Sequence, residues 1–151
     1  MLMQLPVSFF INSISQKDIF YFSSTLLHTS EPHYFICIKK GINDVLLFCV
    51  SSTQKDKILQ RIKVSGFRSE TMVHIKPNAE DSESPFPDNS YIDCNHVFPY
   101  TTQDFKKMYE DGRIKVINQL PVKYFEEIIN GVCLSDNVDL EIIESLNNPI
   151  A

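Results

Sequence analysis

The fold of this chain is decided by the stretch His33-Tyr-Phe-Ile-Cys-Ile38, which is followed by a second apolar run, Val45-Leu-Leu-Phe-Cys-Val50. Between the two runs, residues 39–44 include a Gly, an Asn and an Asp, the residue types that favour a tight turn. Two apolar runs joined by such a turn are typical of a β-hairpin. The sequence therefore predicts that the two runs pair as antiparallel neighbours in a sheet.

Further strands are expected on both sides of this hairpin. They are short segments rich in aromatic and β-branched residues, and they cover residues 18–22, 71–75, 90–94 and 113–117. No internal repeat accompanies them. This pattern favours a small antiparallel sheet built from neighbouring segments.

Helical spacing of apolar residues marks the other elements. From Thr53, apolar residues recur with Lys and Arg between them, which predicts either a short helix ended by Gly66 or a long polar excursion. Thr101 resembles an N-cap for a helix that places Phe105, Met108 and Tyr109 on one face. Pro121 suits the first turn of a further helix, and either Ser135 or Asp136 is expected to cap a last one.

These elements predict an α+β fold, with a small, strongly curved antiparallel sheet and C-terminal helices. The 151 residues are expected to form a single domain, spanning 1–151. Within it, residues 1–16 read as an irregular N-terminal extension, and residues 77–89 as an exposed acidic loop.

Composition excludes several classes of protein. A net charge of −5 argues against holding nucleic acid by bulk attraction, although it leaves room for a local basic patch. The four cysteines lie far apart without a CxxC pair, which favours buried free thiols in a reducing compartment. Neither a signal peptide nor a long apolar span is evident, so the expected location is cytoplasmic, without membrane contact.

The familiar cofactor motifs are missing from the sequence. It contains no Walker loop, dinucleotide-binding glycine fingerprint, HExxH motif, nucleophile elbow or zinc-spaced Cys/His set. We therefore expect no cofactor and no metal site.

Polar residues gather instead where the predicted strands end. His33 opens one strand of the hairpin and Ser51-Ser-Thr-Gln-Lys55 leaves the other, so both are expected at the same end of it. An imidazole, a hydroxyl and a lysine together can bind a phosphate and move a proton, as RNA cleavage at a 2′-hydroxyl requires. Simpler roles remain open: His33 as a strand cap, and Ser51–Thr53 as a helix N-cap.

The order of these segments resembles the MazF/PemK-like toxin family. The resemblance lies in Lys17-Asp-Ile-Phe-Tyr21, Pro32-His-Tyr-Phe-Ile-Cys-Ile38, Val45-Leu-Leu-Phe-Cys-Val-Ser-Ser-Thr-Gln54 and Ser90-Tyr-Ile-Asp-Cys-Asn95, within residues 17–135. It implies an SH3-like barrel with C-terminal helical elements, homodimers, and metal-independent cleavage of single-stranded RNA.

The resemblance also implies roles for individual residues. Thr53 matches the family's strand-end Thr, which is implicated in cleavage, and Asp93 matches the acidic residue of its later strand. Where the family has an Arg before the Pro of the second strand, this chain has Glu31. Phosphate stabilisation would then have to come from Lys39, Lys55 or a protonated His33.

The leading hypothesis is therefore a toxin-like endoribonuclease of a bacterial toxin–antitoxin system, with an antitoxin-like protein as its partner. Cleavage is assigned to Ser52 or Thr53, with His33 as acid or base. RNA binding is assigned to Lys39, Gln54, Lys55, Asp93 and Asn95. The rival hypothesis is a non-catalytic interaction module that uses the same fold, with its last two helices as the binding surface.

Overall fold

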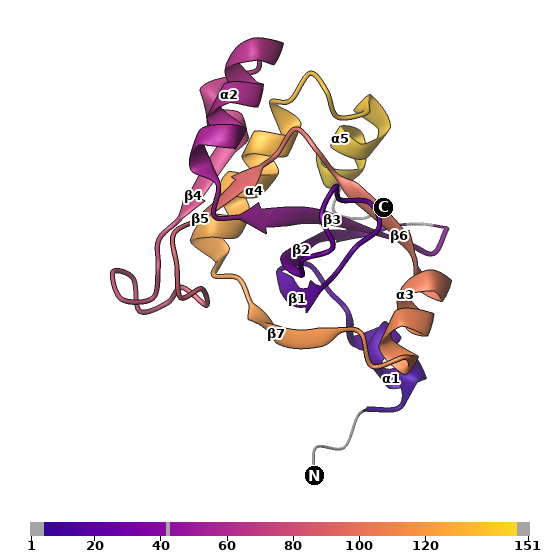
Figure 1. Cartoon of the computed structure of the whole chain (residues 1–151). Coiled ribbons are helices and arrows are strands. Elements are labelled where there is room, and N and C mark those ends of the chain that lie inside the picture. The colour runs from indigo at the N-terminus through magenta and orange to yellow at the C-terminus, as the bar shows by residue number, and fades with distance from the viewer. Residues whose placement is uncertain (1–4, 42, 148–151) are drawn as a thin grey trace.

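The predicted hairpin is present in the computed structural model, which describes residues 5–41 and 43–147. It consists of β2 (His33–Lys40) and β3 (Val45–Ser52), paired antiparallel with Phe35 opposite Val50 (Figure 1). In the turn, Asn43 and Asp44 have left-handed backbone angles, with φ of 68° and 57°. Asn and Asp tolerate this conformation better than most residues, so the turn chemistry read from the sequence explains why the chain reverses here.

Five more strands extend the hairpin into an antiparallel sheet: β1 (Asp18–Phe22), β4 (Met72–Ile75), β5 (Ser90–Asp93), β6 (Phe98–Thr101) and β7 (Lys115–Gln119). The order is β4-β5-β3-β2-β1-β7, and β6 pairs with the first half of β3 while β5 pairs with its last residues. The end strands β4 and β7 do not pair with each other within residues 5–41 and 43–147, so the sheet is open there.

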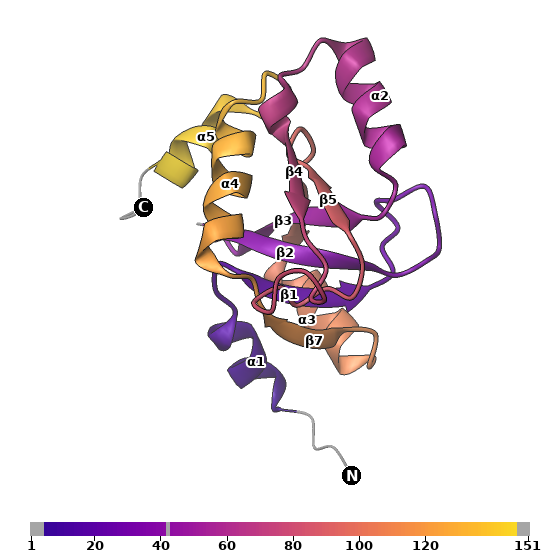
Figure 2. The same ribbon diagram turned by 90° about the vertical axis from the view of Figure 1, so that its left-hand side faces the viewer.

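The helices lie on both faces of this sheet. Their bounds are α1 (Val7–Ser13), α2 (Lys55–Ser65), α3 (Thr102–Glu110), α4 (Val122–Cys133) and α5 (Leu140–Asn147), with a short 3-10 turn at Ser69–Thr71. Figures 1 and 2 show α4 and α5 on one side of the central strands, and α1 and α3 on the other. The sheet is thus covered from both sides.

The central strands are apolar in almost every position because both of their faces are buried. Alternate residues such as Ile36, Ile38 and Cys49 pack with the α4 residues Ile128 and Val132. The residues between them form a largely aromatic core on the other face, completed by α1 and α3: Phe10, Phe20, Phe22, Phe35, Phe48, Phe105 and Tyr109. Continuous apolar runs are typical of strands covered on both faces.

Three helices follow their sequence signals closely. Gly66, with φ of 72°, is the C-cap of α2 in the left-handed conformation that glycine adopts without strain. Thr101 accepts a hydrogen bond from the Asp104 backbone amide at the start of α3. In α4, Ile128 and Val132 are fully buried. These predictions are confirmed.

Several expectations are wrong. The helices are not confined to the C-terminal part of the chain and the predicted helix before Gly66, because α1 precedes the first strand and was not predicted. Within residues 1–16, the described part is not simply irregular, since Phe10 of α1 stacks on Tyr109 at 3.7 Å. The last helix begins at Leu140, and Ser135 donates its hydroxyl hydrogen to Asn95 instead of capping it.

The segment 77–89 is irregular, as expected, but it is tied to the fold at two points. Asp81 accepts a hydrogen bond of 2.5 Å from the Tyr124 hydroxyl. It also forms an ion pair with Lys123, whose ammonium nitrogen lies 2.7 Å from the carboxylate. Phe86 is fully buried against the α4 side of the sheet. The loop therefore returns to the sheet at a fixed place.

All four cysteines are free thiols, as the sequence predicted, but Cys133 is only partly buried. Cys37, Cys49 and Cys94 are buried, and burial raises the pKa of both Cys37 and Cys49 to about 12. Across the described ranges, no helix has the length and apolar character needed to span a membrane.

Candidate active site

A cleft lies at the end of the hairpin where β2 begins and β3 ends. It encloses about 280 Å³, and we call it the strand-end cleft. Its lining residues come from the ends of β1, β2 and β3 and from the loop before β5: Tyr21, Glu31, Pro32, His33, Tyr34, Ser51, Ser52, Thr53, Gln54, Pro87, Asp88 and Ser90. The structure thus brings His33, Ser52, Thr53 and Gln54 together, as the hairpin register predicted.

His33 is held in a defined orientation at the mouth of β2. Its Nδ1 lies 2.9 Å from the backbone carbonyl oxygen of Glu31. A carbonyl oxygen can only accept, so Nδ1 carries the hydrogen and Nε2 is the unprotonated nitrogen of the neutral ring. This arrangement leaves Nε2 as the nitrogen that can take up a proton.

Two hydroxyls follow at the end of β3. The Ser52 Oγ accepts a hydrogen bond of 3.1 Å from the Gln54 backbone amide, which leaves its own hydrogen free to donate. Thr53 is exposed, and its hydroxyl has no hydrogen-bond partner among residues 5–41 and 43–147. His33 makes no hydrogen bond to either hydroxyl within the same described ranges.

The N-terminus of α2 adjoins these hydroxyls. Gln54 is its N-cap and provides no side-chain hydrogen bond to the first turn. The first amides of a helix lack partners within the helix and face back along its axis, here toward Thr53. They add a partial positive charge beside the cleft.

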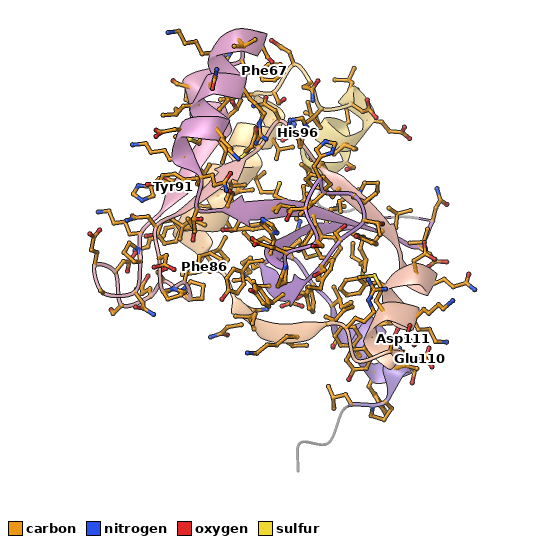
Figure 3. All side chains as sticks on the ribbon, viewed as in Figure 1. Phe67, Phe86, Tyr91, His96, Glu110 and Asp111 are labelled. Carbon is orange, nitrogen blue, oxygen red and sulfur yellow. The ribbon has the colours of Figure 1, made fainter. Side chains whose placement is uncertain are left out.

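Among the lining residues that were not predicted as part of a site, four bring aromatic rings or carboxyl groups to the cleft. Tyr21 and Tyr34 form one wall, with ring centroids 4.6 Å apart, and burial, together with Tyr21 and Asp88, raises the pKa of Tyr34. Glu31 and Asp88 bring carboxyl groups to the rim. Phe86, labelled in Figure 3, is fully buried, and it fixes the segment that carries Asp88.

An aromatic pair lies next to the cleft on the outward face of the sheet. Tyr91, labelled in Figure 3, is opposite Ser52 in the β3–β5 ladder and stacks on His74 with centroids 4.8 Å apart. The His74 Nε2 is 2.7 Å from the Asn89 Oδ1, and the Lys55 ammonium lies 5.9 Å from the centre of the Tyr91 ring. Lys55 is therefore beside the cleft and not among its lining residues.

Lys39 is placed far from the cleft, at the other end of β2. A register shift between Cys37 and Lys39 pairs Lys39 with Leu47, which turns its side chain toward the α4 side of the sheet. Its ammonium donates a hydrogen bond of 3.0 Å to the Ser145 carbonyl oxygen in α5. The expectation that Lys39 joins the same site as His33 is wrong.

Asp93 and Asn95 form a separate buried network and do not line the cleft. The Asp93 carboxylate accepts from Arg61 at 3.3 Å and from the Asn95 side chain at 2.9 Å. The Asn95 side chain also donates to the Thr71 hydroxyl at 2.8 Å and accepts from the Ser135 hydroxyl at 2.6 Å. These bonds tie β5 to the segment after α4, which is a structural role.

No metal-binding cluster of three or more His, Cys, Asp or Glu residues occurs in the described part of the chain. Comparison with protein-family models and with curated proteins finds no match to this chain.

Proposed function

We propose that this protein is a metal-independent endoribonuclease of the toxin type, with the strand-end cleft as its active site. The observation that carries the proposal is the meeting of His33 with the Ser52 and Thr53 hydroxyls in one cleft. A base and hydroxyl donors at such a place are the groups that cleavage of an RNA backbone requires.

The proposed reaction is an attack of the ribose 2′-oxygen on the adjacent phosphorus. The His33 Nε2 takes the 2′-hydroxyl proton, the new oxygen–phosphorus bond forms, and the bond to the 5′-oxygen breaks. The 5′-oxygen leaves with a proton from solvent, which gives a 2′,3′-cyclic phosphate and a 5′-hydroxyl. The Ser52 and Thr53 hydroxyls donate hydrogen bonds to the phosphate oxygens, where negative charge increases in the transition state.

The positive charge that a phosphate needs comes from three sources in this proposal. The first is the imidazolium of His33 after it takes up the proton, and the second is the N-terminus of α2. The third is Lys55, beside Tyr91. Together they would replace the Arg that the toxin family carries where this chain has Glu31.

The Tyr91–His74 pair extends the proposed site along the RNA. Both rings are accessible, and a nucleobase can stack on an exposed aromatic face whatever its sequence. Because Tyr91 is opposite Ser52, a base held there would place its neighbouring phosphate near the hydroxyls. Sequence-tolerant binding of single-stranded RNA follows from this arrangement.

The wider proposal follows the resemblance to the MazF/PemK-like toxins. It comprises a cytoplasmic homodimer, inhibited by an antitoxin-like protein, with a sheet related to the SH3-like barrel. Support for a barrel-like sheet comes from β3, which pairs with β6 over Val45–Phe48 and with β5 at Ser51 and Ser52. A strand that changes partner along its length turns the sheet as it does so.

A second candidate function is a non-catalytic interaction module. The observation that favours it is the pair of carboxyl groups at the rim, Glu31 and Asp88, which would repel a phosphate. In that case the cleft would take a basic or neutral group of a protein partner. The two functions differ in whether the purified protein cleaves RNA.

The test is incubation of the purified protein with mixed-sequence single-stranded RNA in the presence of a metal chelator. The enzyme hypothesis predicts fragments that end in 2′,3′-cyclic phosphate, detected by mass spectrometry. Intact RNA after incubation with correctly folded protein would contradict it and favour the interaction module.

A further inference from the structure

A second and larger cavity lies between α4, α5 and the ends of β1 and β2. It encloses about 840 Å³, and we call it the α4 groove. Its lining includes Lys17, Lys39 and Lys40 from the strand ends, and Val122, Phe125 and Ile129 from α4. None of them lines the strand-end cleft.

The α4 side of the groove is apolar. Helix α4 uses Tyr124, Ile128 and Val132 to pack against the sheet, and these residues are buried. A second row of apolar residues, Val122, Phe125 and Ile129, lies on an adjacent face and remains partly accessible, with Val122 53% exposed. An amphipathic helix normally has one apolar stripe toward the core. Phe125 and Ile129 pack in part against the core, and their accessible portions, together with Val122, are available for a partner.

The opposite side of the groove is basic. The Lys39 ammonium donates to the Ser145 carbonyl oxygen at 3.0 Å, and the Lys40 ammonium donates to the Ile11 carbonyl oxygen at 2.9 Å. Of Lys17, Lys39 and Lys40, none has a carboxylate within 4.0 Å among residues 5–41 and 43–147. Glu126 is the one acidic residue among the groove's described lining.

The lack of a carboxylate partner is unusual for Lys39 because this residue is buried. The residue is only 8% exposed, and charged groups that are buried to this extent are generally paired with an opposite charge. A backbone carbonyl satisfies one of the three ammonium hydrogens. The positive charge gathered here also contrasts with the net charge of −5 of the whole chain.

We propose that the α4 groove binds an acidic, amphipathic peptide segment of a partner protein. Its carboxylates would pair with Lys17, Lys39 and Lys40, and its apolar side chains would cover Val122, Phe125 and Ile129. The apolar row favours a peptide over RNA, because Val122 and Ile129 are aliphatic and offer neither charge to a phosphate nor a ring to a base. The proposal does not depend on catalysis at the strand-end cleft.

The test uses a random peptide library displayed on phage and selected against the whole protein. The peptides recovered are then measured against three proteins by fluorescence anisotropy: wild type, the double variant Lys17→Glu/Lys40→Glu, and the matched control Lys57→Glu/Lys63→Glu. The control has the same change in charge but places it on α2. Circular dichroism confirms that each variant is folded.

The proposal predicts peptides rich in Asp and Glu with interspersed apolar residues. Their affinity should fall by about tenfold or more in the groove variant, stay near wild type in the control, and weaken with added salt. Failure to recover peptides, recovery of neutral or basic peptides, or equal binding to the groove variant would overturn the proposal. So would single-stranded RNA that competes for the groove and loses affinity in the same variant.

Discussion

Tyr91 lies directly opposite Ser52 in the β3–β5 ladder, which joins the aromatic pair to the strand-end cleft. Residues opposite each other in an antiparallel ladder point to the same face of the sheet. The ring and the hydroxyl therefore share one surface. In the proposed site Tyr91 stacks on a base and takes no part in proton transfer. Its replacement therefore tests RNA binding separately from catalysis.

Replacing Tyr91 with Ala should weaken the binding of single-stranded RNA by about 1–3 kcal/mol, the usual contribution of one stacked base. Tyr91→Phe keeps the ring and should bind almost as wild type does. Fluorescence anisotropy with a labelled RNA measures both affinities. Equal affinity in the Ala variant and wild type would remove Tyr91 from the proposed site.

Asn95 should be needed for stability and not for RNA contact. Its side chain is 1% exposed and is bonded to Thr71, Asp93 and Ser135. Asn95→Ala removes three buried side-chain hydrogen bonds at once, so the free energy of unfolding should fall by about 1–3 kcal/mol. Urea unfolding of this variant, with the exposed Asn78→Ala as control, measures the effect. Unchanged stability of Asn95→Ala would contradict the structural role.

The Asp81 contacts should make stability depend on pH in the acid range. Hydrogen bonds from Lys123 and Tyr124 lower the pKa of Asp81 from its ordinary 3.8 to about 2. The folded state thus favours the carboxylate, and this contribution is fully present above the ordinary pKa and lost as pH falls through about 2.

The corresponding measurement is the difference in free energy of unfolding between wild type and Asp81→Asn. The difference should be present at neutral pH and should shrink as the pH falls from about 4 to about 2. Glu83→Gln is the control, because Glu83 is exposed and its distance to Lys123 is 3.6 Å. A difference that stays constant over this range would contradict the assignment.

Gly131 is required where α4 passes close to Cys94, just after β5, and to Glu70 in the 3-10 turn. A Cβ atom at this position would lie 2.8 Å from the Cys94 Sγ and 3.0 Å from the Glu70 carbonyl oxygen. Overpacking of this kind costs about 1–3 kcal/mol, which outweighs the gain of up to ~1 kcal/mol from placing Ala in a helix. Gly131→Ala should therefore be less stable than wild type in urea unfolding, whereas the exposed Glu127→Ala should not. Equal stability of the two variants would show that α4 can move away.

The hairpin and the meeting of His33 with Ser52 were predictable, because the turn residues and the two apolar runs determine which strand ends meet. Strand β6 and helix α1, which depend on contacts between distant parts of the chain, were not predictable. Strand β6 was missed because it has only four residues and includes Pro99. Helix α1 lacks a side-chain cap and depends on Phe10 packing against Tyr109, a residue far away in the chain.

The misplaced site residues have similar causes. Lys39 was expected beside His33, but the register shift after Cys37 directs its side chain to α5. Asp93 and Asn95 lie at the end of a strand as predicted, yet buried partners far away in sequence take up their polar groups. Asp88 reaches the cleft because Phe86 is buried, which local patterns do not reveal.

The most direct test of the central claim compares RNA cleavage rates of wild type, His33→Ala and Thr53→Ala under single-turnover conditions with a metal chelator. The exposed His28→Ala is the matched control, since His28 does not line the cleft. Removing a general base should slow cleavage by about 10²–10⁴-fold with RNA binding retained. Cleavage that is absent in wild type, or unchanged in both cleft variants, would contradict the claim that this cleft is the active site.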